Sequence, residues 1–553
     1  MRTPANPFMN VVVWLGCVLA LSSLSSCSMG SVSAQNRDVP SLDTRPNVIV
    51  ILVDDQRYDA FGALNASLKT PSLDRLLSEG VRYENAFVTT SLCSPSRASI
   101  MSGQAMRNHG IVDNNSPTPE GFQPFSVLLD EAGYDTAFIG KWHMGNADNS
   151  PKDGFDHWVS FEGQGNYGTT DAFGRPSVFN VNGETVQQTM YISDELTDYA
   201  VRWLQDRSSS PFLLFLSHKA VHLPFTPAER HSDLYRNTSF PLPQNARPDD
   251  RSGPRPMWLT TQNNSWHGSD FAFYSDRPLE EIQRSYYAAL SGVDESTGRI
   301  LDTVNVIDSQ RDTVIIYTSD NGFMFGEHGL VDKRAAYEAS MRVPFVIHAP
   351  NRFEGGTVSP VLARNIDIAP TILSLADVEI PDHYDGRDLL SVDPALDYEA
   401  LIYEYYWEFN YPQTPSTFAI RTQNIKYIQY HGVWDTEELF DLESDPDEMN
   451  NLILDPAYQE TLIEMRARLH EGLRTRGANP AVPFTERYNQ GAVFWNPDVS
   501  THVGFPEHWA RSADAEDKYE HILPDSPAKN EQLKGITPIL RSILDASEEE
   551  MTP

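Results

Sequence analysis

The sequence predicts an α/β fold, with a large mixed, mostly parallel sheet sandwiched by helices and a smaller C-terminal α+β subdomain that carries an antiparallel sheet. Three observations lead to this prediction. Four apolar runs are continuous rather than alternating, which is typical of strands buried on both faces. Helical patterns lie between these runs, which favours parallel connections. Three strand-like segments rich in aromatic and charged residues follow residue 400.

The four apolar runs are the predicted strands of the main sheet and cover residues 47–53, 136–140, 211–216 and 313–318. Apolar residues at i, i+3 and i+4 predict helices between them, such as 72–80, which ends at a glycine, and 194–203. A sheet of this kind binds its ligand beyond the carboxyl ends of its strands. A polar cluster follows each run, so we expect the clusters to meet at one site. The clusters are Asp54-Asp55, Lys141-Trp142-His143, His218 to His222, and Asp320-Asn321.

Each polar cluster also has an ordinary interpretation when it is taken alone. An acidic pair such as Asp54-Asp55 can end a strand in a turn, and Asn321-Gly322 is a strong turn signal. Lysines and histidines can belong to solvated loops or serve as structural side chains. Taken together, the carboxylates at two strand ends offer hard oxygen ligands suited to Ca²⁺ or Mg²⁺. The sequence shows no cysteine or clustered histidine pattern that would indicate zinc.

The first residues predict export. An apolar run over residues 11–24 follows Arg2 and has the length of a signal-peptide core rather than a membrane span. The segment Leu24-Ser25-Ser26-Cys27 resembles a bacterial lipobox, which assigns residues 1–27 to the signal and makes Cys27 a lipidated anchor. Cleavage after Ala34 is the alternative and would remove Cys27. We therefore expect a protein of the periplasm or cell surface, or a secreted one, that reaches a membrane through a lipid anchor only.

Cys93 is unpaired once the signal is removed, which excludes a disulfide scaffold and a cysteine-rich metal site. Pro95 suits the first turn of a helix, so Cys93 is predicted at or just before a helix N-terminus, where backbone N–H groups favour an anion. A buried small hydrophobe is one alternative. A reactive thiol with His143 or His222 as its base is another.

The segment Cys93-Ser94-Pro95-Ser96-Arg97, with the following Ala-Ser-Ile-Met-Ser-Gly, is similar to the signature of the type I, formylglycine-dependent sulfatases of the alkaline phosphatase-like superfamily. The chain looks most like the bacterial carbohydrate sulfatases of this family. The resemblance covers roughly residues 45 to 455. It includes residues 45–47, 54–55, 140–143, 320–322, 326–329, 333, 342–344 and 438–446.

The resemblance implies a modified nucleophile and a metal ion. It implies that a maturation system outside this chain oxidises Cys93 to Cα-formylglycine (3-oxoalanine). One hydroxyl of the hydrated aldehyde attacks sulfur, and the other allows sulfate to leave. The resemblance also implies one Ca²⁺, which as a Lewis acid would polarise the hydrated aldehyde and the sulfate oxygens. Its implied ligands are Asp54, Asp55, modified Cys93, Asp320 and Asn321.

The resemblance also implies the remaining catalytic residues. His222 is expected to protonate the leaving alcohol, and His143 to remove a proton from the second hydroxyl. Arg97, one helical turn from Cys93, is placed to hydrogen-bond the hydrate. Lys141 and Lys333 would neutralise sulfate oxygens. These cations supply the locally positive site that an anionic substrate needs in a chain of net charge -35, which itself makes nucleic acid a poor partner.

The domain assignment follows the resemblance: residues 45–395 form the catalytic domain, 396–480 the C-terminal subdomain, and 481–553 a tail that wraps over both. The strand-like segments of the subdomain are 403–408, 418–421 and 426–431. Four of its side chains suit contacts with a sugar ring, although a sheet packed on the main domain accounts for them equally well. They are Trp407, Glu408, Arg421 and His431. A long insertion over 225–277 contributes Trp258, Trp266 and His267 as further candidates.

The sequence therefore predicts a sulfuric ester hydrolase that removes sulfate from a sulfated polysaccharide or oligosaccharide. An arylsulfatase and a phosphonate or phosphodiester hydrolase on the same fold are alternatives. A non-catalytic, cell-surface glycan-binding lipoprotein is an alternative of another class. The intact set of candidate ligands and catalytic side chains favours an enzyme, because a binding protein has no need of all of them.

Overall fold

The computed structural model describes residues 44–475, apart from 146–147, 208, 247–251, 263–264, 266, 270–276, 308–310, 395–399, 409–410 and 432–434. The predicted signal segment with Cys27, the candidate Trp266 and the predicted tail over 481–553 lie outside the described residues. Within the described residues, no helix is both long enough and apolar enough to cross a membrane.

The main sheet has ten strands among the described residues, and the four apolar runs form its four adjacent central strands, as predicted. Strands β8, β1, β7, β3 and β4 are parallel to one another, whereas β11 and the β5–β6 hairpin bring in antiparallel pairs. In spatial order the strands are β12 (Thr357–Arg364), β2 (Val81–Phe87), β11 (Phe345–His348), β8 (Thr313–Ser319), β1 (Asn47–Val53), β7 (Phe212–Ser217), β3 (Asp135–Gly140), β4 (His157–Ser160), β5 (Val178–Val181) and β6 (Glu184–Gln187).

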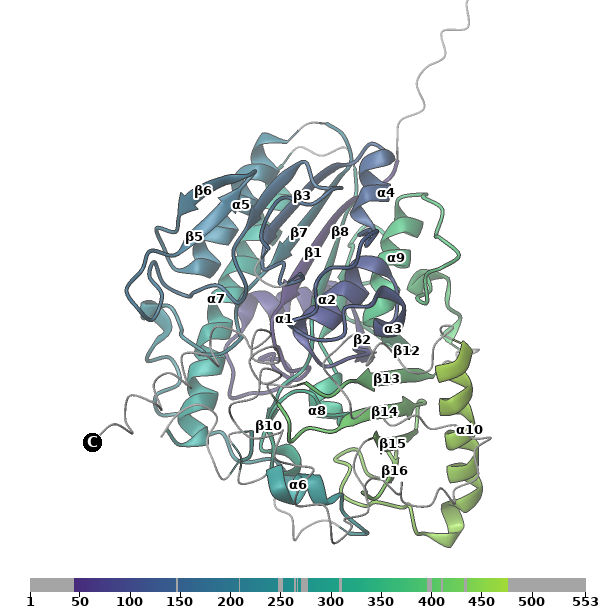
Figure 1. Cartoon of the computed structure of the whole chain (residues 1–553). Helices are drawn as coiled ribbons and strands as arrows, with labels where there is room; N and C mark the ends of the chain where they lie inside the picture. The colour runs from purple at the N-terminus through teal and green to yellow at the C-terminus, as the bar shows by residue number, and fades with distance from the viewer. Residues whose placement is uncertain are drawn as a thin grey trace, which may run out of the picture.

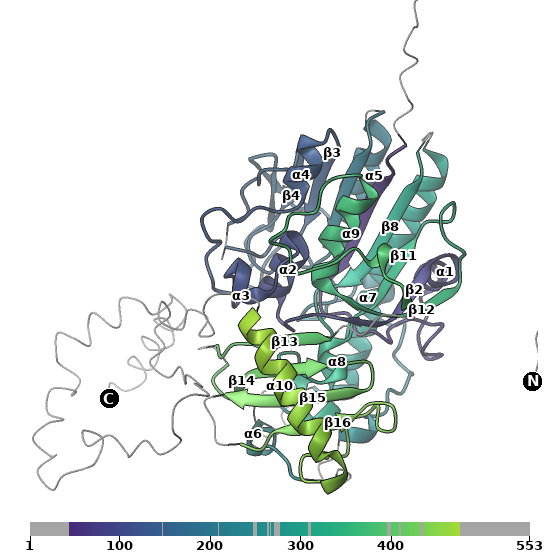
Figure 2. The ribbon, with the colours of Figure 1, turned by 90° about the vertical axis from the view of Figure 1, so that its right-hand side faces the viewer.

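Helices cover both faces of this sheet (Figures 1 and 2). One face packs on α1 (Pro71–Glu79), α5 (Ile192–Asp206) and α7 (Leu279–Val306), and the other on α2 (Cys93–Ser102), α4 (Ser126–Glu131) and α9 (Ile368–Leu375). The predicted helices over 72–80 and 194–203 are therefore α1 and part of α5. The other elements of this domain are α3 (Met106–His109), α6 (Met257–Gln262), α8 (Glu338–Met341), β9 (Met324–Phe325) and β10 (Val331–Asp332).

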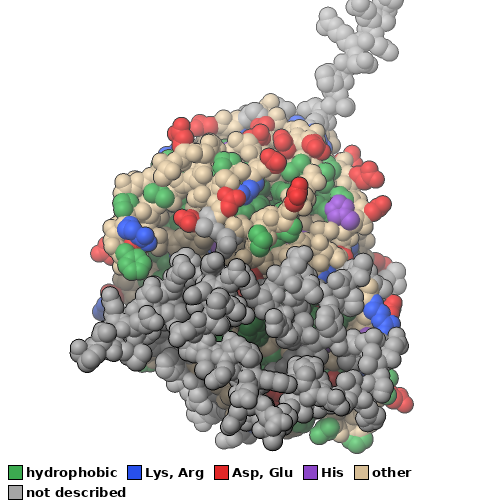
Figure 3. Space-filling model, viewed as in Figure 1, with side chains coloured by type: hydrophobic (Ala, Val, Ile, Leu, Met, Phe, Trp, Pro, Cys, Tyr) green, Lys and Arg blue, Asp and Glu red, His purple; other side chains and the backbone are tan. Residues whose placement is uncertain are grey.

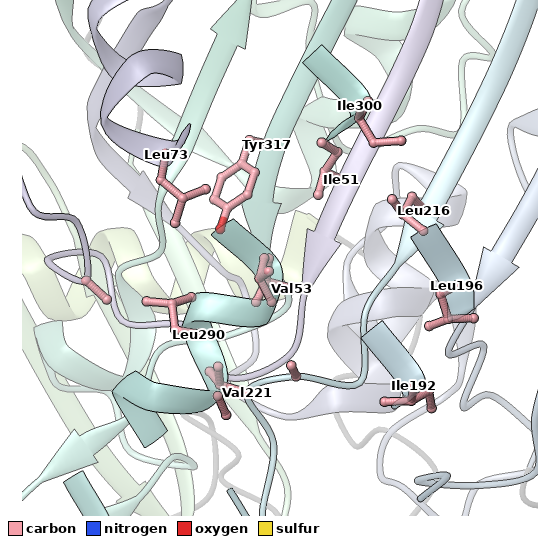
Figure 4. Close-up of a cluster of buried hydrophobic side chains, with 14 of the residues drawn as sticks. Ile51, Val53, Leu73, Ile192, Leu196, Leu216, Val221, Leu290, Ile300 and Tyr317 are labelled. Atoms are coloured by element: carbon pink, nitrogen blue, oxygen red, sulfur yellow. The ribbon is translucent and has the colours of Figure 1, made fainter. Parts of the chain in front are cut away.

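Strand β1 shows why the predicted runs are continuous. Its residues Ile49, Ile51 and Val53 belong to the apolar cluster of α1, α5 and α7, while the residues between them belong to the cluster of the opposite face. Figure 4 shows Ile51 and Val53 in the first cluster. Successive side chains of a strand point to opposite faces, so a strand covered on both sides must be apolar at every position. The run ends at Val53, and Asp54, which follows it, is also fully buried but carries a charge.

The C-terminal subdomain carries the predicted antiparallel sheet. Its strands are β13 (Leu401–Tyr405), β14 (Ser416–Arg421), β15 (Ile425–His431) and β16 (Glu438–Asp441), each antiparallel to the next. Helix α10 (Gln459–Thr475) covers one face, as Figure 2 shows, through residues such as Leu462 and Leu469. The other face packs on the main domain. This confirms the predicted fold class, while the exact domain boundaries stay a prediction.

Buried ion pairs fasten the subdomain to the main domain. Arg107 of α3 donates to Glu404 of β13 at 2.7 Å, and the backbone N–H of Glu404 donates to the carbonyl of Thr89 at 2.9 Å. Lys426 of β15 lies 2.8 Å from Glu338 of α8. Thr89 and Arg107 lie on either side of α2 in the sequence, so these contacts hold the helix that begins with Cys93.

The surface reflects the acidic composition. On the described part of the face in Figure 3, Asp and Glu side chains outnumber Lys and Arg. This agrees with the net charge of -35, and it means that any positive site for an anionic ligand must be local.

An aromatic cluster beneath β3 gives a test of the core. Phe138 stacks on Trp158 with ring centroids 4.8 Å apart, and Trp142 packs edge-on at 5.3 Å. We expect Phe138→Ala to lower the free energy of unfolding by roughly 3–5 kcal/mol, because it opens a cavity in a packed core. Thermal unfolding followed by circular dichroism measures the change. The control is Phe173→Ala, at a side chain that is 84% exposed and should leave the midpoint unchanged. Equal midpoints for the two variants would contradict this packing.

Candidate active site

The polar clusters that follow the central strands meet at one edge of the sheet, as expected. Asp54 and Asp55 follow β1, Lys141 and His143 follow β3, and His222 lies in the loop after β7. Asp320 and Asn321 follow β8, the first turn of α2 enters beside them, and Lys333 comes from the segment after β10. All ten predicted metal and catalytic side chains belong to this one network. They are Asp54, Asp55, Cys93, Arg97, Lys141, His143, His222, Asp320, Asn321 and Lys333.

Three buried carboxylates form the centre of the site. Asp54, Asp55 and Asp320 each offer an oxygen, and these oxygens all lie within 4.8 Å of one another. Burial, reinforced by the Asp54 charge, raises the pKa of Asp320 to about 7. Burial also raises the pKa of Asp55, although Lys333 acts against it. Burial also acts to raise the pKa of Asp54, but the positive charges of Lys141 and neighbouring cations outweigh it and hold this pKa well below its ordinary value.

The oxygen atoms of this centre fit a hard cation. The Asn321 side-chain N–H donates to Asp55 at 2.6 Å and to the Gly322 carbonyl at 2.9 Å. Its Oδ1 is buried and has no hydrogen-bond donor among the described residues. A buried polar atom without a partner is costly, and carboxylates packed this closely repel each other. One divalent cation with oxygen ligands would relieve both effects.

Cys93 begins α2, which confirms its prediction at a helix start. Its Sγ is fully buried, 3.0 Å from Lys333 Nζ and 3.7 Å from Asp54 Oδ1. Burial raises the pKa of the Cys93 thiol to about 12, although Lys141 and Lys333 act against it. An unmodified Cys93 is therefore a neutral thiol near pH 7 and a poor nucleophile, which argues against the reactive-thiol alternative.

Arg97 ties three strand ends together. Its Nε donates to Asp320 at 2.8 Å, and its Nη1 donates to the Lys141 carbonyl at 2.7 Å and to Ser217 Oγ at 2.8 Å. Its Nη2 lies 3.7 Å from Asp54 Oδ1 and has no hydrogen-bond acceptor among the described residues. One guanidinium group thus joins the ends of β8, β3 and β7 and keeps one donor available on the side of Asp54.

The two lysines face the carboxylates and the thiol. Lys141 Nζ contacts Asp54 and donates to Gln164 Oε1 at 2.6 Å. Lys333 Nζ contacts Asp55 as well as Cys93. Both ammonium groups are buried and lie within reach of one centre, which is the arrangement that binds the oxygens of an anionic group.

The two histidines are neutral in this arrangement. Burial, together with the positive charge of Lys141, holds the pKa of His143 well below its ordinary value. Burial likewise lowers the pKa of His222, although the charge of Asp54 acts against it. His222 Nδ1 lies 2.9 Å from the Leu223 carbonyl, which can only accept, so this nitrogen carries the proton. Its Nε2 lies 3.8 Å from Asp55 Oδ2 and faces the centre.

The sequence did not identify three residues of the site. Gln164 bridges Lys141 and His143, and the Tyr167 hydroxyl donates to the His222 carbonyl at 2.6 Å. Lys219 is buried over the Tyr167 ring at 4.7 Å, and burial, with Lys141 nearby, lowers its pKa to about 7. Lys219 lies inside the predicted polar cluster from His218 to His222, but sequence alone does not separate a buried lysine from a solvated one. Nothing in the sequence around Gln164 indicates a role in the site, apart from the glycine on either side of it.

The predicted sugar contacts occupy different places. The Glu408 carboxylate is buried and accepts from Arg334, the residue after Lys333, at 2.8 Å. Trp407 Nε1 donates to the Pro412 carbonyl at 3.1 Å. Arg421 is buried in an ion pair with Glu338 at 3.0 Å.

The His431 ring packs edge-on against Phe418 at 5.1 Å. Contacts within the subdomain and with α8 thus account for Arg421 and His431. The substrate roles of Trp407, Glu408, Arg421 and His431 stay predictions.

Among the described residues of the insertion over 225–277, His267 lies near Lys333. His267 Nδ1 lies 2.9 Å from Asp332 Oδ2, and its ring packs edge-on against Tyr411. Trp258, on α6, packs against Tyr430 of the subdomain at 5.5 Å. His267 thus lies beside the segment that carries Lys333, and Trp258 lies against the subdomain.

The fold and the site together define a hydrolase of the alkaline phosphatase-like class, with carboxylates at the strand ends, a cysteine at a helix start and two flanking lysines. The chain belongs to the sulfatase family. The sulfatase family model matches residues 46–378, and the model of the C-terminal part of N-sulphoglucosamine sulphohydrolase matches residues 326–475. The protein is thus an enzyme, a sulfatase, as the resemblance predicted.

Individual relatives agree with this assignment. The chain is 33% identical over 519 residues to the N-acetylglucosamine-6-O-sulfatase of Bacteroides thetaiotaomicron, with 82% of this chain and 89% of the relative covered. A solved structure in complex with its substrate, D-glucosamine-2-N,6-O-disulfate, matches with a TM-score of 0.71 and 30% identity, over 78% of this chain and 98% of the other. The phosphonate monoester hydrolase of Agrobacterium radiobacter shares the fold, with a TM-score of 0.62 and 22% identity over 78% of this chain and 96% of the other.

The buried, neutral state of Cys93 predicts low thiol reactivity. In protein made without oxidation of Cys93, iodoacetamide at pH 8 should leave this residue unmodified, because a thiol whose pKa is raised to about 12 stays protonated until well above that pH. The same reagent should label Cys93 after denaturation. Mass spectrometry of the Cys93 peptide measures both. Rapid labelling of the folded protein at pH 8 would show that the site is open or that the thiolate is stabilised.

Proposed function

We propose that this sulfatase removes a sulfate ester from a sulfated glucosamine residue of a carbohydrate, through an oxidised Cys93 and a calcium ion. The observation that carries the proposal is the convergence of Cys93, two lysines and four oxygen-bearing side chains at one sheet edge. The named relatives support the sugar class: one is an N-acetylglucosamine-6-O-sulfatase, and a neighbouring structure holds a sulfated glucosamine.

The residues present fit the two groups that the proposal requires. Asp54, Asp55, Asp320 and the free Oδ1 of Asn321 would hold the calcium ion beside residue 93. When present, the metal and the formylglycine hydrate supply Lewis-acid polarisation and a nucleophile with two hydroxyl groups. The other contributions come from side chains that the structure contains.

Lys141 and Lys333 bind the sulfate oxygens and stabilise the charge that develops on them during transfer. Both nitrogens are buried, so their charges act in a medium of low dielectric constant, where they are stronger than in water. His222 presents Nε2 to the centre and donates the proton that the leaving sugar oxygen needs, for which the ring must first be protonated. Tyr167 and the Leu223 carbonyl hold the ring and its backbone in place.

The proposal includes export, on the basis of the apolar run over residues 11–24 and the lipobox-like segment that ends at Cys27. It also includes an external maturation system, because oxidation of Cys93 requires an oxidant and an enzyme that the chain does not supply. A lipid anchor at Cys27 would place the site where it meets polysaccharide outside the cytoplasm.

The proposal is tested by comparing substrates on enzyme isolated from a host that oxidises Cys93. We expect sulfate release from a 6-sulfated glucosamine to exceed hydrolysis of an aryl sulfate, a phosphate ester and a phosphonate ester. Cys93→Ala should lose at least about three orders of magnitude in kcat, since it removes the nucleophile. The Cys93 peptide of active enzyme should carry the lighter aldehyde in mass spectrometry.

Each alternative function gives its own result in this test. Faster turnover of phosphate or phosphonate esters would favour the related hydrolases, and faster turnover of the aryl sulfate would favour an arylsulfatase. Glycan binding that survives Cys93→Ala without sulfate release in the wild type would favour a binding protein. Active enzyme with only unmodified thiol at Cys93 would contradict the proposed nucleophile.

Metal removal gives a test that does not need a substrate. We expect EGTA to lower the thermal midpoint of the mature enzyme and Ca²⁺ to restore it, because a ligand at 100 times its Kd adds about 2.7 kcal/mol to stability. Asp320→Asn should abolish most of this calcium effect. The control is Asp294→Asn, a buried carboxylate that accepts from the Ser72 and Leu73 N–H groups outside the site and should keep the effect. A calcium effect of equal size in both variants would contradict the ligand assignment.

A further inference from the structure

We propose that Gln164 is a positioning residue that fixes the proton of His143 on Nδ1 and makes Nε2 a hydrogen-bond acceptor. The catalytic consequence rests on the proposed function, but the position of the proton does not. Four hydrogen-bonding groups, taken in order, carry the inference: the Lys141 ammonium, the Gln164 amide, the His143 ring and the Ser94 hydroxyl.

The orientation of the Gln164 amide follows from Lys141. A lysine ammonium group can only donate, so the atom of Gln164 that lies 2.6 Å from Lys141 Nζ must be the carbonyl oxygen. The amide nitrogen then lies 3.1 Å from His143 Nε2. The alternative orientation would place N–H groups against an ammonium group, which repel each other. The lysine therefore sets the direction of the amide.

The Gln164 amide in turn sets the His143 ring. An amide NH₂ group can only donate, so His143 Nε2 must accept and cannot carry a proton. The ring is only 7% exposed and has Lys141 and Arg97 nearby, which favours the neutral imidazole with a single proton. The single proton of the ring therefore lies on Nδ1.

The Ser94 hydroxyl completes the chain in the same direction. Ser94 Oγ donates its only hydrogen to the His143 carbonyl at 2.5 Å, so towards the ring it can only accept. His143 Nδ1 lies 3.4 Å from this oxygen, in the position of a long donor. His143 has a φ of 54°, which turns its backbone so that its carbonyl and its ring both meet Ser94. Ser94 is the neighbour of Cys93.

The loop that carries Gln164 is constrained to present it. Gly163 and Gly165 flank it with φ values of 55° and 62°, a region that side chains other than glycine rarely adopt. A Cβ atom at position 165 would overlap the ring of Phe161. A loop that needs two such glycines around one glutamine places its amide in a defined position between Lys141 and His143.

This arrangement has a consequence for catalysis. Both ring nitrogens of His143 are engaged, so the resting enzyme holds His143 as a hydrogen-bond donor at Nδ1 rather than as a base. The nitrogen without a proton is Nε2, so the ring can accept a proton there only when the Gln164 amide moves away from it. A sulfate oxygen that replaces Gln164 Oε1 at Lys141 would release the amide. Sulfate binding and the proton position of His143 would then be coupled through one side chain.

The direct test is neutron diffraction from deuterium-exchanged crystals of the ligand-free enzyme. We expect deuterium on His143 Nδ1 and none on Nε2. Deuterium on Nε2 would overturn the inference, and so would an amide oxygen of Gln164 that faces His143. Neither result depends on whether the enzyme acts on a sulfated glucosamine, so failure here and failure of the proposed function are distinguishable.

A matched pair of variants tests the same chain in solution. In Gln164→Glu the carboxylate accepts from both neighbours, so the proton of His143 should move to Nε2. In Gln164→Met the shape is kept without a hydrogen bond, and neither tautomer should be enforced. The ¹⁵N shifts of histidine-labelled protein report the change. A ring in Gln164→Glu that keeps the wild-type ¹⁵N pattern would overturn the inference.

Kinetics and a simple anion probe separate positioning from structural support. Both variants should lose roughly 10- to 100-fold in kcat, which is less than the loss expected when an acid–base group is removed altogether. KM should change by less than about twofold. Inorganic sulfate should shift the His143 ¹⁵N signals of the wild type and leave those of Gln164→Met unchanged. Equal shifts in both proteins, or a loss confined to KM, would contradict the coupling.

Discussion

The structure depends on the burial of three carboxylates at one edge of the main sheet. Asp54, Asp55 and Asp320 have oxygens within 4.8 Å of one another, and all three side chains are buried. Buried like charges at this distance are strongly unfavourable unless cations compensate them. Three buried basic side chains, Arg97, Lys141 and Lys333, do so and thereby fix where the other parts of the site can lie.

The parallel register of the central strands makes this burial possible. The backbone N–H of Asp55 donates to Asp320 Oδ1 at 3.0 Å across the paired ends of β1 and β8. Arg97 reaches the ends of β8, β3 and β7 from the first turns of α2, so its helix cannot shift without breaking contacts to three strands. The subdomain adds Glu404, which contacts the chain on both sides of α2 through Thr89 and Arg107. The subdomain therefore supports the active site in part by holding the helix that carries Cys93.

The sequence predicted the fold and the charged core of the site because both leave a strong local pattern. A strand buried on both faces must be apolar throughout, and its end must become polar, so Val53-Asp54 marks both the strand and the site. Cys93 was recognisable because removal of the predicted signal would leave it without a cysteine to pair with, and because the Ser-Pro that follows it marks a helix start. Gln164 and Arg421 show the limit, because a polar residue acts according to partners far away in the sequence. Gln164 meets Lys141 and His143 across a loop, whereas Arg421 meets Glu338.

The charge balance of the centre explains how so acidic a chain receives an anion. Arg97, Lys141 and Lys333 pair with Asp320, Asp54 and Asp55 respectively, so the basic side chains offset the negative charge of the three carboxylates. A divalent cation held by Asp54, Asp55 and Asp320 would make the centre positive and would compete with the lysines for the carboxylate oxygens. Lys141 and Lys333 would be released to bind sulfate oxygens by the same event, since each now contacts one of those carboxylates. The net charge of -35 is a sum over the whole chain, and its exposed part is screened by salt, whereas Arg97, Lys141 and Lys333 act within the buried site, where screening is weak.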